Sequence, residues 1–162
     1  MRRASITIVV ALLVWGSPGV AAASMDPEPI MKGPKTHNSP ISLYQGRHYV
    51  PRHNHIRLCI RHRESRSDYR AVSRTGEYRG AYQMTPALGV GAGWMIQKEL
   101  RRTGTPKREA LYIGRQLRAY PINQWHPHYQ DMAFWLIWDN GKGAFHWKAT
   151  VPGTDCGPGY HR

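Results

Sequence analysis

Acidic residues are scarce in this chain of 162 residues. Asp and Glu together number 10, against 23 Lys and Arg, so the formal net charge is +13. Such an excess of positive charge indicates an anionic partner or surface. Nucleic acid is one candidate. A bacterial cell wall rich in carboxylates and phosphates is the other.

Long hydrophobic runs are absent after the first part of the chain. Ala4–Trp15 is apolar, follows a pair of arginines and precedes the small residues of GVAAAS. This pattern is typical of a secretory signal peptide, and we expect residues 1–23 to be removed by cleavage near Ala23. A membrane anchor is the alternative, but the run is shorter than the roughly 20 residues that span a bilayer. The sequence therefore predicts an exported protein, secreted or held in the cell wall, with no membrane span after cleavage.

Cysteine is almost absent too, because the chain has only Cys59 and Cys156. An even pair in an exported protein suggests a disulfide. Such a bridge would close a loop of roughly 100 residues, for which chain entropy alone predicts a stabilisation of about 4 to 5 kcal/mol. Two unpaired thiols are the alternative.

The rest of the chain divides into a leader and one domain. Residues 24–54 contain five prolines and few apolar residues, which predicts a flexible leader or linker, although Ile41–Pro51 could pack locally. Residues 55–162 are long enough for a single domain with its own core, which we expect to be monomeric.

A short helix is predicted over His55–Glu64. Apolar residues and one acid share a face of this helix, spaced at i, i+3, i+4 and i+8: Ile56, Cys59, Ile60 and Glu64. The arginines are expected mainly on the solvent side. Partial desolvation and the negative end of the helix dipole both disfavour a charge on Glu64. Arg61 and Arg63 would favour that charge if they reach it.

The remaining elements predict an α+β fold that is mostly α. Tyr69–Gln83 is expected to form a strand, a turn and a strand, which is a short hairpin beside the first helix. Thr85-Pro86 begins a helix, which the glycine-rich GVGAGW could interrupt before Met95–Leu100. Thr105-Pro106 begins another helix that runs to about Tyr120, with an inner face of Ala110, Ile113, Gly114 and Leu117.

Two segments near the C-terminus complete the prediction. Residues 130–138 (QDMAFWLIW) indicate a short apolar helix in the core. The tail after it has no regular pattern and would be anchored by Cys156. Trp135, Trp138 and Trp147 are expected in the core, and the same is expected of Trp94.

One stretch, ESRSDYRAVSRTGEYRGAYQMTP, resembles the core signature of the lysozyme-like lytic transglycosylases and the related resuscitation-promoting factors. In those proteins a Glu-Ser pair ends a helix, and an Ala-x-Ser strand, a glycine turn, a Gly-x-x-Gln strand end and a Thr-Pro helix start follow. The matching positions here are Glu64-Ser65, Ala71-Val72-Ser73, Gly76, Gly80-Ala81-Tyr82-Gln83 and Thr85-Pro86. The resemblance covers about residues 56–86.

The resemblance implies a small lysozyme-like domain that cleaves the β-1,4 bond between MurNAc and GlcNAc in peptidoglycan. It implies that Glu64 is the catalytic acid and base and that Gln83 and the Tyr78–Tyr82 strand line the sugar cleft. Ser65 and Thr75 are expected among the substrate-binding residues, although Ser65 could instead cap or orient the turn after the helix. A carboxyl group whose pKa is raised can protonate the leaving oxygen, as a glutamate does in lysozyme. The same group can then deprotonate the sugar's own 6-hydroxyl, so that no water is needed.

Two other functions remain as alternatives to a transglycosylase that uses a single glutamate. A hydrolase of the lysozyme type would need a second carboxylate, for which Asp68 and Glu77 are the candidates. A basic wall-binding module with no activity is also open. Many relatives have two glycines after Glu-Ser, whereas this chain has Arg66-Ser67. Gln83 could instead hydrogen-bond the hairpin.

Metal and cofactor chemistry is not indicated. The histidine pairs lie at irregular spacings with no carboxylate or thiolate in a recognised pattern: His53, His55, His126 and His128. We therefore expect no metal site and no cofactor. Most of the arginines are interpreted as a solvated face that helps the protein adsorb to an anionic wall.

Overall fold

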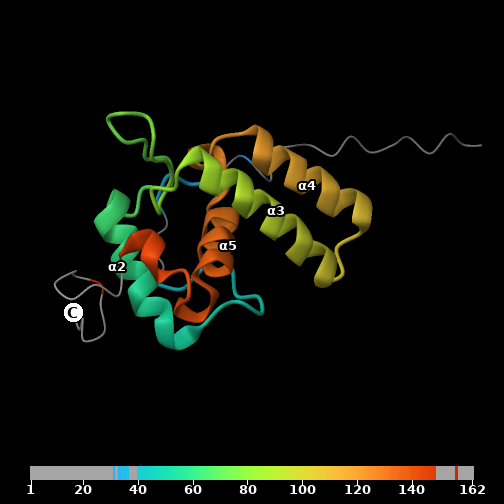
Figure 1. The fold of residues 1–162 in the computed structure, drawn as a ribbon, viewed down its shortest axis with the longest axis horizontal. Helices are drawn as coiled ribbons and strands as arrows, with labels where there is room; N and C mark the ends of the chain where they lie inside the picture. Colours follow the sequence, from blue (N-terminus) through green and yellow to red (C-terminus); the bar gives the residue numbers. More distant parts are fainter. Residues whose placement is uncertain (1–30, 32, 37–39, 149–155, 157–162) are drawn as a thin grey trace, which may run out of the picture.

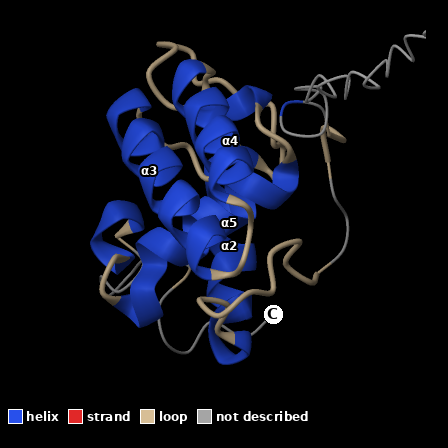
Figure 2. Cartoon of the chain, turned by 90° about the vertical axis from the view of Figure 1, so that its right-hand side faces the viewer, coloured by secondary structure: helices blue, strands red, loops and turns tan. Residues whose placement is uncertain are grey.

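The computed structural model describes residues 31, 33–36, 40–148 and 156, and the expected signal peptide lies outside them. This part of the chain is mostly helical (Figures 1 and 2). The α-helices are α2 (Asn54–Ser65), α3 (Pro86–Arg102), α4 (Lys107–Ala119) and α5 (Pro127–Trp138). Short 3-10 helices connect or follow them: η1 (Pro51–His53), η2 (Ile122–Gln124), η3 (Asp139–Gly141) and η4 (Ala144–Trp147). None of the helices described is both long and apolar enough to cross a membrane.

Helix α5 forms the centre of the core, as its apolar sequence predicts. It runs through the middle of the molecule in Figure 1, with α2 on one side and the α3–α4 pair on the other. All residues from Gln130 to Trp138 are buried. The helix begins at Pro127, three residues earlier than expected, because the ring of His126 accepts a hydrogen bond from the amide of His128 and caps it.

The helix α3 is continuous, and the expected interruption at GVGAGW is wrong. Its glycines lie where neighbouring elements approach the helix closely. A Cβ on Gly89 would lie 2.7 Å from Ile122, and one on Gly93 would lie 2.8 Å from the side chain of Arg118. Close packing therefore offsets the low helix propensity of glycine. Helix α4 buries the predicted inner face of Ala110, Ile113, Gly114 and Leu117.

The expected hairpin over Tyr69–Gln83 is reduced to isolated pairings. Within the described residues, Val72 pairs with Arg79 and Arg79 pairs with Met84, but neither pairing extends into a strand. The amide of Gly80 donates to the carbonyl of Ala71 at 2.8 Å. The segment therefore consists of two successive tight turns, because each antiparallel pairing ends after one residue.

The domain begins earlier than residue 55, so the prediction of a flexible leader is wrong for its last part. Ser42 is buried, and both its hydroxyl and the amide of Leu43 donate hydrogen bonds to the carboxylate of Asp131 on α5. Arg47 forms an ion pair at 2.7 Å with the buried Glu99 of α3. These polar contacts hold the segment on the domain, together with the buried ring of Tyr44 and the packing of Tyr49 on Trp135.

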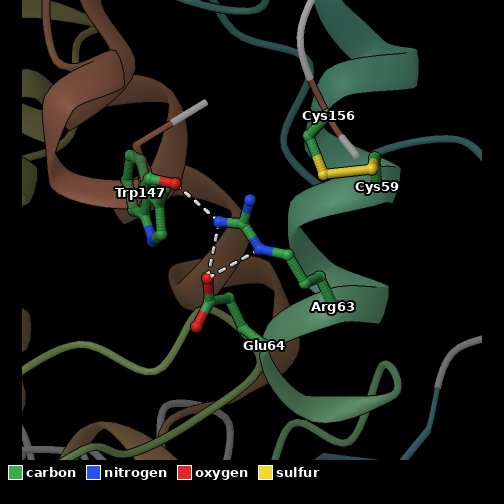
Figure 3. The surroundings of a disulfide bond; sticks show 5 residues. All are labelled: Cys59, Arg63, Glu64, Trp147 and Cys156. Carbon is green, nitrogen blue, oxygen red and sulfur yellow. Dashed lines mark hydrogen bonds and ion pairs between the residues drawn. A yellow bond between two sulfur atoms is a disulfide. The ribbon is translucent and has the colours of Figure 1, made fainter. Parts of the chain in front are cut away.

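A disulfide joins Cys59 of α2 to Cys156, as predicted (Figure 3). The two Cα atoms are 5.5 Å apart, and 97 residues separate them in sequence. Cys156 is fully buried, and the bridge holds it against α2 five residues before Glu64.

Candidate functional site

Glu64 lies in the last turn of α2, and its side chain remains 26% exposed. The guanidinium of Arg63 donates to one carboxylate oxygen of Glu64 at 2.7 Å and to the carbonyl of Trp147 at 2.5 Å (Figure 3). The neighbouring arginine therefore does reach the acid, a point that the sequence left open. The pair joins the end of α2 to η4.

The chain leaves α2 through two consecutive residues in the left-handed region. Arg66 has φ 54° and Ser67 has φ 66°. The amide of Arg66 donates to the carbonyl of His62 at 2.7 Å, and that of Ser67 donates to the carbonyl of Arg61 at 3.1 Å. Glycine adopts this conformation without steric cost, whereas other residues do so rarely. The turn after Glu64 thus has a glycine-type backbone without glycine.

Ser65 ties the end of α2 to the turn segment. Its hydroxyl lies 3.1 Å from the carbonyl of Arg61 and 2.9 Å from that of Ala81, and donates to them. This orienting role is one of those expected for Ser65. On the other side, the indole N–H of Trp147 donates to the carbonyl of Tyr82 at 2.9 Å. Residues 81–82 are therefore fixed between η4 and Ser65, the residue that follows Glu64 on α2.

Close packing against α5 explains why the first position of the Gly-x-x-Gln motif is a glycine. Gly80 has φ 76°, and a Cβ there would lie 2.5 Å from the amide oxygen of Gln130 on α5. That oxygen accepts a hydrogen bond from the amide of Ala81 at 2.9 Å. Gln83 has φ 46° and donates its side-chain N–H to the carbonyl of Gly80. Gln83 thus makes the hydrogen bond within the turn that was the alternative to a place in the cleft.

Tyr82 does not line a cleft, and this expectation from the motif is wrong. The residue is 1% exposed, and its ring stacks on Phe134 with the centroids 4.8 Å apart. Its hydroxyl donates to Asp131 at 2.6 Å and accepts from Arg57 at 3.0 Å. Tyr82 is therefore a core residue whose polar end belongs to a buried network.

That buried network surrounds Asp131 and was not predicted. The carboxylate forms an ion pair at 3.3 Å with Arg57, and both side chains are fully buried. Tyr69 and Tyr82 donate to its other oxygen at 2.8 and 2.6 Å. Burial, with the charge of Asp131 as the next cause, raises the pKa of Tyr69 to about 12 and raises that of Tyr82 as well.

The prediction that the arginines of α2 lie on a solvated face is wrong for two of them. Arg57 and Arg61 are 0% and 4% exposed. Arg61 donates to the hydroxyl of Tyr69 at 2.9 Å. The spacing contained a usable signal, because Arg57, Ile60, Arg61 and Glu64 fall at i, i+3, i+4 and i+7 on one helical face. The prediction instead placed the buried face through Ile56 and Cys59, because these residues are apolar and the arginines are charged.

The other residues of the expected sugar-binding set lie on the turn segment. Tyr78 is 42% exposed, and its amide donates to the hydroxyl of Ser73 at 3.0 Å. Thr75 is exposed, with its hydroxyl 3.3 Å from that of Ser73. Neither has a contact with Glu64 among the described interactions. They are accessible, but the structure does not join them to the acid.

The two candidates for a second carboxylate have other surroundings. Asp68 forms an ion pair at 3.3 Å with Lys35 and accepts the amide of Arg70 at 2.8 Å. Glu77 is exposed near the tip of the turn segment. Asp68 thus shapes the turn after α2, and Glu77 has the environment of a solvated charge.

Among the tryptophans, Trp135, Trp138 and Trp147 are buried, as expected. Trp94 is the exception: it is 55% exposed on α3, and the expectation that it belongs to the core is wrong. The guanidinium carbon of Arg118 lies 3.5 Å from the centre of its ring. The stacked arginine gives the indole a partner at the surface.

The histidines and acids in the described ranges form no group of three that could hold a metal ion. His53 accepts a hydrogen bond from the indole of Trp138 at 3.0 Å, and a ring nitrogen of His128 lies 2.9 Å from the carbonyl of Leu43.

Comparison with known proteins identifies no relative: no protein-family model, curated protein or solved structure matches this chain.

Proposed function

We propose that this protein is an exported, lysozyme-like glycosidase that cleaves the β-1,4 bond between MurNAc and GlcNAc of peptidoglycan, with Glu64 as general acid and base. One observation carries the proposal. Arg66 and Ser67 both have a left-handed backbone, at the two positions after Glu-Ser where many of the proteins that the motif resembles have glycines. The backbone thus keeps the shape that glycine favours although the residues differ.

The surroundings of Glu64 support this role. Its side chain is only partly exposed. Its two neighbours in the chain contact the segments on either side: Ser65 contacts the carbonyl of Ala81, and Arg63 contacts that of Trp147 in η4. In the proposed reaction the protonated Glu64 gives its proton to the glycosidic oxygen, and the bond from that oxygen to C1 of MurNAc breaks. The carboxylate of Glu64 then takes the proton of the 6-hydroxyl, whose oxygen bonds to C1 and forms a 1,6-anhydro ring. The acid is regenerated without water.

Arg63 sets a condition on this mechanism. Glu64 is paired with the Arg63 guanidinium, whereas a proton donor has to carry a proton itself. The side chain of Arg63 is 28% exposed, so it can turn toward solvent when a glycan enters. We therefore propose that substrate binding separates this ion pair before proton transfer.

The single-glutamate route is favoured over a hydrolase because Asp68 is held by Lys35 and by the Arg70 amide. A hydrolase needs a second carboxylate that faces the substrate. The two routes leave different products. A transglycosylase leaves anhydro ends, and a hydrolase leaves reducing ends.

The test is digestion of purified peptidoglycan by the protein and by its Glu64→Gln variant, with the fragments analysed by mass spectrometry. We expect fragments with anhydro ends and a loss of rate of at least about 100-fold in Glu64→Gln, in line with general acid–base catalysis. Glu77→Gln is the matched control, since it removes an exposed acid near the tip of the turn segment and should leave the rate unchanged. Equal rates for Glu64→Gln and the unmodified protein contradict the assignment. No fragments from either, with binding retained, would indicate a wall-binding module.

A further inference from the structure

The exposed face of α3 carries one aromatic residue and three cations in a single stripe. Trp94, Lys98, Arg101 and Arg102 are spaced at i, i+4, i+7 and i+8, and all four are exposed. Together with Gln97 they line a surface depression of about 510 Å³. The stripe shares no residue with the group around Glu64.

Arg118 of α4 contacts two of the residues that line this depression. Its guanidinium stacks on the indole of Trp94 at 3.5 Å and donates to the amide oxygen of Gln97 at 3.1 Å. A side chain on Gly93 would collide with the stem of Arg118, at 2.8 Å from its Cγ. Because Gly93 has no side chain, Arg118 can pass over α3 at this point and stack on the indole of Trp94.

The positive charge here is not neutralised within the described part of the chain. None of the ion pairs found there involves Lys98, Arg101, Arg102 or Arg118. Burial, and then the charge of Arg115 on the same helix, lower the pKa of Arg118. Like charges one turn apart destabilise a helix, so this arrangement favours an anionic ligand that would relieve it.

We propose that Trp94, Lys98, Arg101 and Arg102, with Arg118 behind the indole, form a binding site for an anionic saccharide. The carboxylate or phosphate group of the ligand binds the cations, and the apolar face of its sugar ring packs on the exposed part of Trp94. The site extends over about 12 Å of helix, which matches two or three sugar units. A single-stranded nucleic acid is disfavoured because such sites use several aromatic residues for successive bases, and this stripe has one. The site does not depend on the glycosidase activity of Glu64.

The test measures binding by calorimetry with four probes: an oligogalacturonate, a phosphorylated oligomannose, dextran and a single-stranded oligothymidylate. We expect the anionic saccharides to bind in a salt-dependent manner and dextran not to bind. The tighter of the two anionic saccharides identifies the preferred anionic group. Trp94→Ala and the double variant Arg101→Gln/Arg102→Gln should each weaken binding about tenfold. Both alter exposed side chains, and unchanged melting temperatures would exclude misfolding.

Matched control variants distinguish binding at this site from non-specific attraction to the positive charge of the whole protein. Phe145→Ala removes an aromatic residue that is 69% exposed on η4, and Lys107→Gln/Arg108→Gln removes two exposed cations of α4. Both should bind the saccharides like the unmodified protein. The proposal is overturned if either control loses as much affinity as its partner variant, if dextran binds equally well, or if the oligothymidylate binds more tightly than both saccharides.

Discussion

Helices α2 and α3 both carry several arginines, but the two helices place them in opposite environments. On α2, Arg57 and Arg61 are buried and their donors end on Asp131 and on tyrosine hydroxyls. On α3, Arg101 and Arg102 are exposed and form no ion pair in the described residues. The same residue type thus stabilises the core in one helix and provides free positive charge in the other. The net charge of the chain does not reveal this difference.

The largest effect is expected from the partner of the buried arginine. Asp131→Ala leaves Arg57 charged and without its carboxylate in the core, so the free energy of unfolding should fall by about 3 to 5 kcal/mol in urea denaturation. Glu77→Ala, which removes an exposed acid, should change it by less than about 0.5 kcal/mol. Replacing the pair together, as Arg57→Met/Asp131→Leu, should restore only part of the loss, because the hydroxyls of Tyr69 and Tyr82 still lose their acceptor. Equal stability of Asp131→Ala and Glu77→Ala would contradict the buried network.

Alkaline pH should weaken the same buried network. Tyr69 has its pKa raised from 10.0 to about 12 in the fold. Below pH 10 both folded and unfolded chains keep this proton; between pH 10 and 12 only the unfolded chain releases it. Stability from Tyr69 is therefore present below pH 10 and should be lost as pH rises to about 12, by roughly 2 to 3 kcal/mol. Unfolding measured across this range checks the slope, and Tyr69→Phe should reduce it, while Tyr82, whose pKa is also raised, maintains the rest. A slope that Tyr69→Phe leaves unchanged would place the titration elsewhere.

A third comparison uses glycine at one arginine of each helix. Arg66→Gly relieves a left-handed backbone at the end of α2, and thermal unfolding should show a gain of about 1 kcal/mol. Arg101→Gly places glycine inside α3 and should cost about 1 kcal/mol. If both variants lose stability equally, the left-handed turn after Glu64 does not form in solution.

The smallest effect is expected from the exposed cations of α3. Lys98→Gln and Arg101→Gln should each change stability by less than about 0.5 kcal/mol, with a slight gain at low salt because like charges are removed. Melting curves at low and high salt measure this. A loss above about 1 kcal/mol would mean that these side chains have a structural role like that of Arg57.

Local patterns in the sequence predicted the α-helices well, and the cysteine count together with the expected export predicted the disulfide. The apolar inner face of α4 and the Thr-Pro start of α3 depend on residues close together in the chain. The polar core was missed because it depends on distant residues: Ser42 and Asp131 meet across 89 positions. The continuity of α3 also depends on neighbours, since Gly93 fits Arg118 of another helix.

The candidate site divides in the same way. The position of Glu64 at a helix end followed from its spacing and from the motif. The contact of Arg63 with the carbonyl of Trp147 and the burial of Tyr82 could not be predicted, because η4 lies far beyond the motif in the chain. A motif indicates which residues can act, but the packing of later segments determines which of them remain accessible.

The disulfide has a consequence for the order of events during the proposed export. In a chain that is exported from its N-terminus, Cys59 emerges before α3, α4 and α5, whereas Cys156 follows all of the described helices. For most of translocation the first thiol therefore has no partner within its own chain. The bridge within the chain can form only after these helices have emerged, so its closure belongs to the last stage of the proposed export.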